Sequence, residues 1–141
     1  MARDAGTSSY VHGQLIHEAV VHQARANPGA VAVVQGDTRL TYGELDAASD
    51  DYAAELRALG VSEGHRVPVL MGRTPQYVAV VLAVLKCGAA YAALDPRWPE
   101  ERLTSILRRL GPPLAVVEEP RNLPVPVWSA SDHPVGEAAR R

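Results

Sequence analysis

Short apolar runs alternate with longer helical patterns along most of this chain, and that alternation constrains the fold more than any other feature. Apolar runs of strand length occupy residues 67–71, 89–94 and 114–117, with a further one at 125–128. Between two parallel strands the chain must cross back to the end of the sheet where it started, and a helix usually makes this crossover. The order therefore predicts βαβ units and an α/β fold, in which helices cover a mainly parallel sheet on both faces.

The front of the chain has a different pattern. Apolar residues recur at helical spacing over 14–26, and Asn27-Pro28-Gly29 ends that helix. Two short runs, 30–34 and 39–41, flank the turn at Gly36-Asp37 and predict a hairpin. The expected fold is thus a set of flavodoxin-like βαβ units preceded by an N-terminal helix and a small hairpin.

A chain of 141 residues fits one ordinary domain. Residues 1–13 are small and polar and are expected to form a disordered leader. The domain itself is assigned to residues 14–128. Residues 129–141 are polar and without periodicity, and are expected to form a flexible tail.

Local signals predict where the central helices begin and end. Thr41 and Glu44 form a capping box, and Gly60 follows the helix that they begin. Thr74 is a typical N-cap, with Pro75 as the first helical residue. The buried stripe of the first of these helices is expected to comprise Leu45, Ala48, Tyr52, Leu56 and Leu59. Residues 77–85 are apolar on all sides, which predicts a buried helix.

The next helix is expected to begin at Pro99 and has acidic residues in its first turn. Arg108 and Arg109 lie in its last turn, which suits the helix dipole and predicts a solvated end. The buried face of this helix is expected to comprise Leu103, Ile106, Leu107 and Leu110.

Composition excludes several classes of function. The formal net charge is −2 and the sequence pI is about 6.2, which argues against a nucleic-acid-binding surface. No apolar run approaches the ~20 residues of a membrane span, and the first residues lack the apolar core of a secretory signal. A single cysteine permits no internal disulfide, so a cytoplasmic location is expected.

Three segments, in this order and spacing, carry a family resemblance. The first runs from Ile16-His17-Glu18 to the strand at 30–33, the second is Leu40-Thr41-Tyr42-Gly43-Glu44-Leu45, and the third begins with Leu85-Lys86-Cys87-Gly88. They resemble the adenylation domains of nonribosomal peptide synthetases, which are adenylate-forming, AMP-binding enzymes. The residues that match the family motifs, and that we interpret as structural, are Leu40, Thr41, Tyr42, Glu44, Leu45, Leu85, Lys86, Gly88, Ala90, Tyr91, Leu94, Asp95, Pro96 and Arg102.

The sequence departs from the family pattern at several packing positions. Cys87 stands where alanine is usual, and Ala93 replaces a typical proline. The first helix has Ala19, Val20 and His22 where other residues are common. These departures suggest relaxed constraint.

The resemblance implies a reaction that joins a carboxylate to ATP, with Mg as the expected metal ion. In the family, the elements that carry the chemistry follow the third of these segments, downstream of the residues matched here. They are the phosphate loop, the metal-binding acid, the ribose-binding aspartate, the hinge and the catalytic lysine. The only Gly/Ser/Thr cluster, residues 6–9, has no strand before it and no lysine after it. Lys86, the only lysine, occupies a motif position and is interpreted as charge complementing a helix C-terminus. We therefore assign no catalytic, cofactor-binding or metal-binding residue in this chain.

Other reactive residues have structural interpretations. His12, His17 and His22 recur every five positions, so they do not share a helix face and make a poor metal site. Cys87 lies at a helix C-terminus, where the dipole opposes thiolate formation, and is expected to be packed and inert. Asp95 is expected to fix the turn before the next helix.

Three interpretations of function stay open. The first is a truncated amino-acid-adenylation domain that is inactive until the remainder of the domain is supplied. The second is a non-catalytic docking module for a condensation or carrier domain, or for an MbtH-like protein. The third is a decayed remnant without a role. Apolar surface that faces the remaining core in the family predicts self-association or dependence on a partner.

Overall fold

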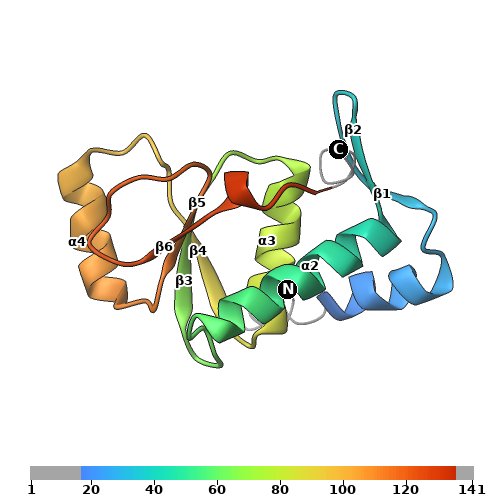
Figure 1. Ribbon diagram of the computed structural model, residues 1–141, viewed down its shortest axis with the longest axis horizontal. Coiled ribbons are helices and arrows are strands. Elements are labelled where there is room, and N and C mark those ends of the chain that lie inside the picture. The colour runs from blue at the N-terminus through green and yellow to red at the C-terminus, as the bar shows by residue number, and fades with distance from the viewer. Residues whose placement is uncertain (1–16, 136–141) are drawn as a thin grey trace, which may run out of the picture.

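A four-stranded parallel sheet forms the centre of the molecule. The computed structural model describes residues 17–135 (Figure 1). The strands are β3 (Arg66–Leu70), β4 (Ala90–Ala93), β5 (Ala115–Val117) and β6 (Val127–Ser129). They lie in the order β4-β3-β5-β6, and every pairing is parallel. The predicted α/β fold with a mainly parallel sheet is confirmed.

Helices cover both faces of this sheet, as predicted (Figure 1). They are α2 (Tyr42–Ala58), α3 (Pro75–Lys86) and α4 (Glu100–Leu110). Successive side chains of a strand point to opposite faces. Val116 of β5 accordingly packs in the cluster formed with α2 and α3, whereas Ala115 and Val117 pack with Leu103 and Leu107 of α4.

The predicted helix and hairpin at the front of the chain are also confirmed. Residues 17–26 are helical, and β1 (Val31–Gln35) pairs with β2 (Thr38–Thr41) in antiparallel fashion. Gly36 in the connecting turn has a φ of +57°, a value that glycine adopts without strain. The hairpin leads directly into α2.

The helix boundaries follow the local signals closely. The Thr41 side chain accepts a hydrogen bond from the Glu44 N–H at 3.1 Å, and the Glu44 carboxylate accepts one from the Thr41 N–H at 3.0 Å. Thr74 likewise caps α3 through the Tyr77 N–H. Pro99 is the N-cap of α4 rather than its first helical residue, and its side chain makes no capping bond.

Two boundary regions differ from the expectations. Leu59 was expected in the buried stripe of α2, but it is 55% exposed because the helix ends at Ala58 and the chain turns away. Residues 129–135, assigned above to the tail, continue the fold. Ser129 is the last residue of β6, and Ala130–Asp132 forms a short 3-10 helix with Ala130 fully buried. The expected leader, residues 1–13, lies outside the described residues.

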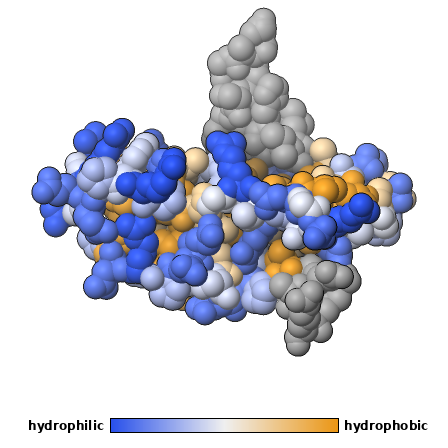
Figure 2. All heavy atoms as spheres, turned by 90° about the horizontal axis from the view of Figure 1, so that it is seen from above, coloured by the Kyte–Doolittle hydropathy of each residue, from blue (hydrophilic) through white to orange (hydrophobic). Residues whose placement is uncertain are grey.

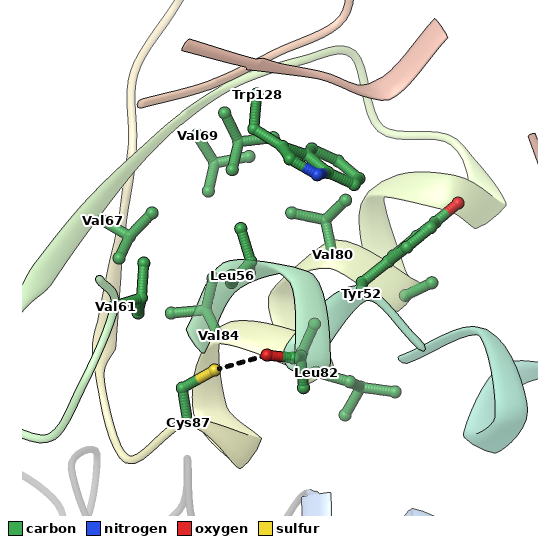
Figure 3. Packing of buried hydrophobic residues seen from close by; sticks show 14 of the residues in the cluster. Tyr52, Leu56, Val61, Val67, Val69, Val80, Leu82, Val84, Cys87 and Trp128 are labelled. Carbon is green, nitrogen blue, oxygen red and sulfur yellow. Dashed lines mark hydrogen bonds between the residues drawn. The ribbon is translucent and has the colours of Figure 1, made fainter. Parts of the chain in front are cut away.

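The larger core lies between α2, α3 and the sheet (Figure 3). Trp128 of β6 packs edge-on against Tyr52 of α2, with ring centroids 5.0 Å apart. The Cys87 thiol points into the same core and donates a hydrogen bond to the Ala53 carbonyl at 3.5 Å. Cys87 is therefore buried, as predicted from the sequence.

Candidate functional site

The topology of the sheet creates a crevice at the carboxyl ends of its strands. β3 and β5 are neighbours, but the chain leaves β3 towards β4 and leaves β5 towards β6. Ligands of open α/β sheets bind at such a switch point. A depression of about 600 Å³ lies here, between the loops that follow β3, β4 and β5. Its polar and aromatic lining includes Gly72, Arg73, Tyr77, Asp95, Trp98 and Glu118.

Asp95, at one side of this crevice, fixes the turn after β4 as predicted. Its carboxylate accepts a hydrogen bond from the Arg97 N–H at 2.8 Å and forms an ion pair with the Arg97 guanidinium at 2.9 Å. The Asp95 carbonyl accepts from the Trp98 N–H at 3.1 Å. The side-chain and backbone hydrogen bonds from Arg97 lower the pKa of Asp95 below its ordinary value. The carboxylate is thus held ionised by its own turn.

The remaining charged groups of the crevice also hold loops. Glu118 accepts a hydrogen bond from the Gly72 N–H at 2.9 Å and so joins the loops after β5 and β3. Arg73 places its guanidinium 5.9 Å from the centre of the Tyr77 ring, while its carbonyl accepts from Gln35 at 3.0 Å. Burial, followed by the nearby Tyr91, raises the pKa of Tyr77. The crevice therefore has the position of a ligand site, but the Asp95 and Glu118 carboxylates that line it are hydrogen-bonded within the protein itself.

The motif residues of α2 and α3 lie away from the crevice. Leu40 and Leu45 are buried in the larger core. Lys86 lies in the last turn of α3, yet its ammonium does more than complement the dipole. It bonds the carboxylates of Asp46 and Asp50 at 2.7 and 2.8 Å and the Ser49 hydroxyl at 2.8 Å, all three on α2.

This contact makes Lys86 a clamp between α2 and α3. The side chain is only 9% exposed, so the ion pair with Asp46 is largely shielded from water. Sequence reasoning missed the clamp because its partners lie 36 to 40 positions earlier in the chain. The only signal for this contact in the sequence was the pair of acidic residues Asp46 and Asp50, which lie four positions apart on α2.

The later motif residues are distributed along the edge of the sheet and the start of α4. Gly88 has a φ of +79° and ends α3. Pro96 accepts a hydrogen bond from Arg121 at 3.0 Å, and Arg102 stacks its guanidinium 4.1 Å above the Trp98 ring. The others lie on β4 or just after it: Ala90, Tyr91 and Leu94. These residues do not converge on a single point in the structure.

A polar cluster that the sequence did not reveal fastens the segment after β6 to the helices. Gln76 of α3 donates to the carbonyls of Ala130 and His133, both at 2.7 Å, and the Tyr52 hydroxyl also donates to the His133 carbonyl. The His133 ring stacks on Trp128 at 4.3 Å and bonds the Glu55 carboxylate at 2.8 Å. We call this cluster of Tyr52, Glu55, Gln76, Trp128 and His133 the clasp.

The described residues do not fit the ATP and Mg that the family resemblance implies. Within residues 17–135, no three His, Cys, Asp or Glu side chains are grouped to hold a metal ion. Helix N-termini could offer backbone donors to phosphate, but the Thr41 and Thr74 side chains occupy such donors on α2 and α3. The N-terminus of α4 has no capping side chain, and its first turn carries Glu100 and Glu101, whose charges oppose a phosphate. Burial raises the pKa of the Cys87 thiol and so disfavours a nucleophilic thiolate. His12 lies outside the described residues.

The described part of the chain also has no helix with the length and hydropathy needed to cross a membrane.

Comparison with known proteins identifies the class of protein to which this fold belongs. The chain belongs to the AMP-binding enzyme family, whose sequence profile matches residues 20–139. It is similar to nonribosomal peptide synthetase ungA of Aspergillus violaceofuscus, with 41% identity over 103 residues, or 73% of this chain and 1% of that protein. Bacitracin synthase 3 of Bacillus licheniformis is 34% identical over 117 residues, which cover 83% of this chain and 2% of the synthase.

Solved structures of similar proteins are consistent with this family. The nonribosomal peptide synthetase FmoA3 superposes with a TM-score of 0.76 at 31% identity, over 83% of this chain and 13% of that chain. The N-terminal subdomain of Klebsiella oxytoca NpsA shares the fold, with a TM-score of 0.72 at 22% identity, over 83% of this chain and 32% of that chain. The chain therefore corresponds to a small part of the synthetases and to about a third of the solved subdomain.

Proposed function

We propose that this chain forms the first part of an amino-acid adenylation domain in peptide biosynthesis, and that it is catalytically inactive until the rest of such a domain is supplied. The proposal is supported by one observation: several of the motif residues make contacts within the protein itself. Thr41 and Glu44 cap α2, Lys86 clamps α2 to α3, and Asp95 fixes a turn. We further propose that the chain acts in the cytoplasm, because its only cysteine is a buried thiol.

Amino-acid-dependent exchange of pyrophosphate into ATP tests this proposal. The purified chain alone is expected to show no exchange with any of the common amino acids. The same chain mixed with a complementary fragment of a related adenylation domain, starting after the residues matched here, is expected to recover exchange. Exchange by the chain alone would overturn the proposal.

Lys86 offers a control for the reconstitution. Lys86→Met should lower exchange by the mixture only through loss of the clamp, and Asp46→Asn with Asp50→Asn should restore it. A catalytic lysine would not be rescued by changes on α2. Failure of the rescue, with all variants folded, would place Lys86 in the reaction and contradict its structural assignment.

A second proposal is a docking role towards a condensation domain, a carrier domain or an MbtH-like protein. It is favoured by the exposed apolar side chains of the hairpin, Val31 and Val34, in the region where Figure 2 shows an apolar area on its right. Changing both valines to threonine keeps the strand propensity of β1 and removes apolar surface. Unchanged binding of the purified synthetase domains by this variant would count against the docking role.

A further inference from the structure

The imidazole ring of His133, in the clasp, contacts a hydrogen-bond acceptor at each of its two nitrogens. Nδ1 lies 3.0 Å from the Ser129 carbonyl oxygen, and Nε2 lies 2.8 Å from a carboxylate oxygen of Glu55. A carbonyl oxygen and an ionised carboxylate only accept hydrogen bonds, so each ring nitrogen has to donate one. A neutral histidine has a single ring N–H, whereas the imidazolium has two. The ring therefore matches its surroundings only when both nitrogens carry a proton.

The groups packed around this ring also favour a positive charge on it. On α2, the Glu55 carboxylate faces Nε2, and Asp51 lies one turn earlier. On β6, the Trp128 ring is stacked on the imidazole, with centroids 4.3 Å apart and planes 14° apart, and the face of an indole attracts a cation. α3 contributes Gln76, which is uncharged, and Asp132 directly precedes the ring in the chain. The charges contributed by these groups are all negative.

Loss of one proton creates a mismatch at Nε2. The Ser129 carbonyl keeps the remaining proton on Nδ1, because this nitrogen can bond a carbonyl only as a donor. The lone pair of Nε2 then faces the Glu55 carboxylate at 2.8 Å, with no proton between the two acceptors. Glu55 keeps the hydrogen bond from the Trp128 indole N–H at 3.3 Å. The contact between the ring and Glu55 is thus attractive for the imidazolium and repulsive for the neutral ring.

From this geometry we infer that the contact between His133 and Glu55 is a proton-dependent latch, which holds the segment after β6 against α2 when the ring is charged and loosens it when the ring is neutral. The backbone contacts of the clasp do not change with the ring. Gln76 donates to the His133 carbonyl at 2.7 Å. Burial raises the pKa of Tyr52, so its hydroxyl stays protonated and continues to donate to the same carbonyl. The segment is therefore loosened rather than released.

The direction of the pH effect follows from proton linkage. Because the closed latch holds the second ring proton more firmly than the open one, its contribution is fully present below about pH 6 and is lost as the pH rises towards about 8. The two side chains are partly exposed, 26% for His133 and 45% for Glu55, so water screens their attraction. We expect opening of the segment to become about threefold more frequent over this range. The latch does not depend on the proposed adenylation role, so pyrophosphate exchange and the pH effect can fail separately.

Nitrogen NMR of the full chain tests the protonation of the ring directly. With nitrogen-15 labelled histidine, both ring nitrogens of His133 should carry a proton at about pH 5.5, and only Nδ1 should carry one at about pH 8.5. His133→Gln, which lacks these signals, assigns them. A neutral ring with its proton on Nε2 would overturn the inference, because Nδ1 would then not donate to Ser129. The same protonation at both pH values would also overturn it.

Hydrogen exchange measures the latch itself, as protection factors that remove the intrinsic pH dependence of exchange. The Ser131 and His133 amides bond the carbonyls of Glu118 and Ala130, and their protection should fall about threefold between about pH 5.5 and about pH 8.5. Glu55→Gln is the matched control, because an amide can accept from the imidazolium and donate to the neutral ring. Its protection factors should change by less than about 1.5-fold. An equal pH dependence in the wild-type chain and in Glu55→Gln would overturn the inference.

Discussion

The two faces of the parallel sheet are covered by helices of different character. α3, on one face, is apolar on most sides and buries Ala79, Val80, Leu82, Ala83 and Val84 between the sheet and α2. α4, on the other face, buries only Leu103 and Leu107 and turns its charged residues to solvent. α3 has neighbours on two sides, whereas α4 has a neighbour on one side. The apolar width of a helix therefore reports how many layers surround it.

The faces also differ in their polar contacts. On the α3 face, the Lys86 clamp and the clasp around Gln76 add hydrogen bonds between elements far apart in sequence. On the α4 face, the comparable contact is Arg121, which bonds Glu100 and the Pro96 carbonyl at the start of the helix. We expect the α3 face to be the more stable part of the molecule, and the following substitutions test this difference.

Matched core substitutions should have the largest effect. Leu56→Ala in α2 should lower the free energy of unfolding by about 3–5 kcal/mol, and Leu107→Ala in α4 by about 2–3 kcal/mol. Both side chains are fully buried, but Leu107 lies in the smaller cluster, whose partly buried members can close part of the cavity. Urea unfolding measures both values. An equal or reversed order would contradict the difference between the faces.

Removal of the Lys86 clamp should have the second largest effect on the free energy of unfolding. Lys86→Met leaves Asp46 and Asp50 without their shared cation and should lower the free energy of unfolding by about 1–3 kcal/mol. The lower half of this range is expected, because Asp50 is largely exposed and water screens its charge. The triple variant with Asp46→Asn and Asp50→Asn should recover most of the loss. A triple variant no more stable than Lys86→Met would contradict the clamp.

The clasp should contribute somewhat less. Gln76→Leu removes the donor to the Ala130 and His133 carbonyls and should lower the free energy of unfolding by about 1–2 kcal/mol. Hydrogen exchange should accelerate mainly in residues 127–133. Gln35→Leu is the matched control, because that side chain makes a single exposed bond to Arg73 and its loss should cost below about 0.5 kcal/mol. Equal effects of the two variants would contradict the role of the clasp.

The helix caps should give the smallest effects. Thr41→Ala and Thr74→Ala each remove a side-chain cap and should lower the free energy of unfolding by about 1 kcal/mol. Ser105→Ala removes a hydroxyl from the exposed side of α4, where it caps nothing, and should change the value by less than about 0.5 kcal/mol. A larger loss at Ser105 than at Thr41 would reverse the comparison.

Sequence reasoning predicted the elements that depend on near neighbours. The capping box at Thr41, the N-cap at Thr74 and the turn at Asp95 involve residues at most three positions apart, and all are present. Sequence reasoning was less successful where the end of an element depends on packing against residues far away in the sequence. Leu59 continued a periodic stripe in the sequence but lies beyond the end of α2 and is 55% exposed.

The candidate site was predicted only in part. The turn at Asp95 was expected, but the crevice beside it exists because β3 and β5 become neighbours, and no local signal reports strand order. The clasp likewise joins Tyr52 to His133 over 81 positions. The assignment of the family-motif residues to structural roles stays a prediction, which the exchange experiments test.

The sequence by itself determined the alternation of strands and helices, the helix caps, and membership of the AMP-binding family, because these depend on composition and on short-range spacing. Only the tertiary structure decided which side chain meets which. It brought Lys86 against two aspartates of α2, joined the segment after β6 to the helices, and placed β3 beside β5 in the sheet. The physical reason is that such contacts join residues brought together by strand order, and strand order is set by the packing of the whole domain.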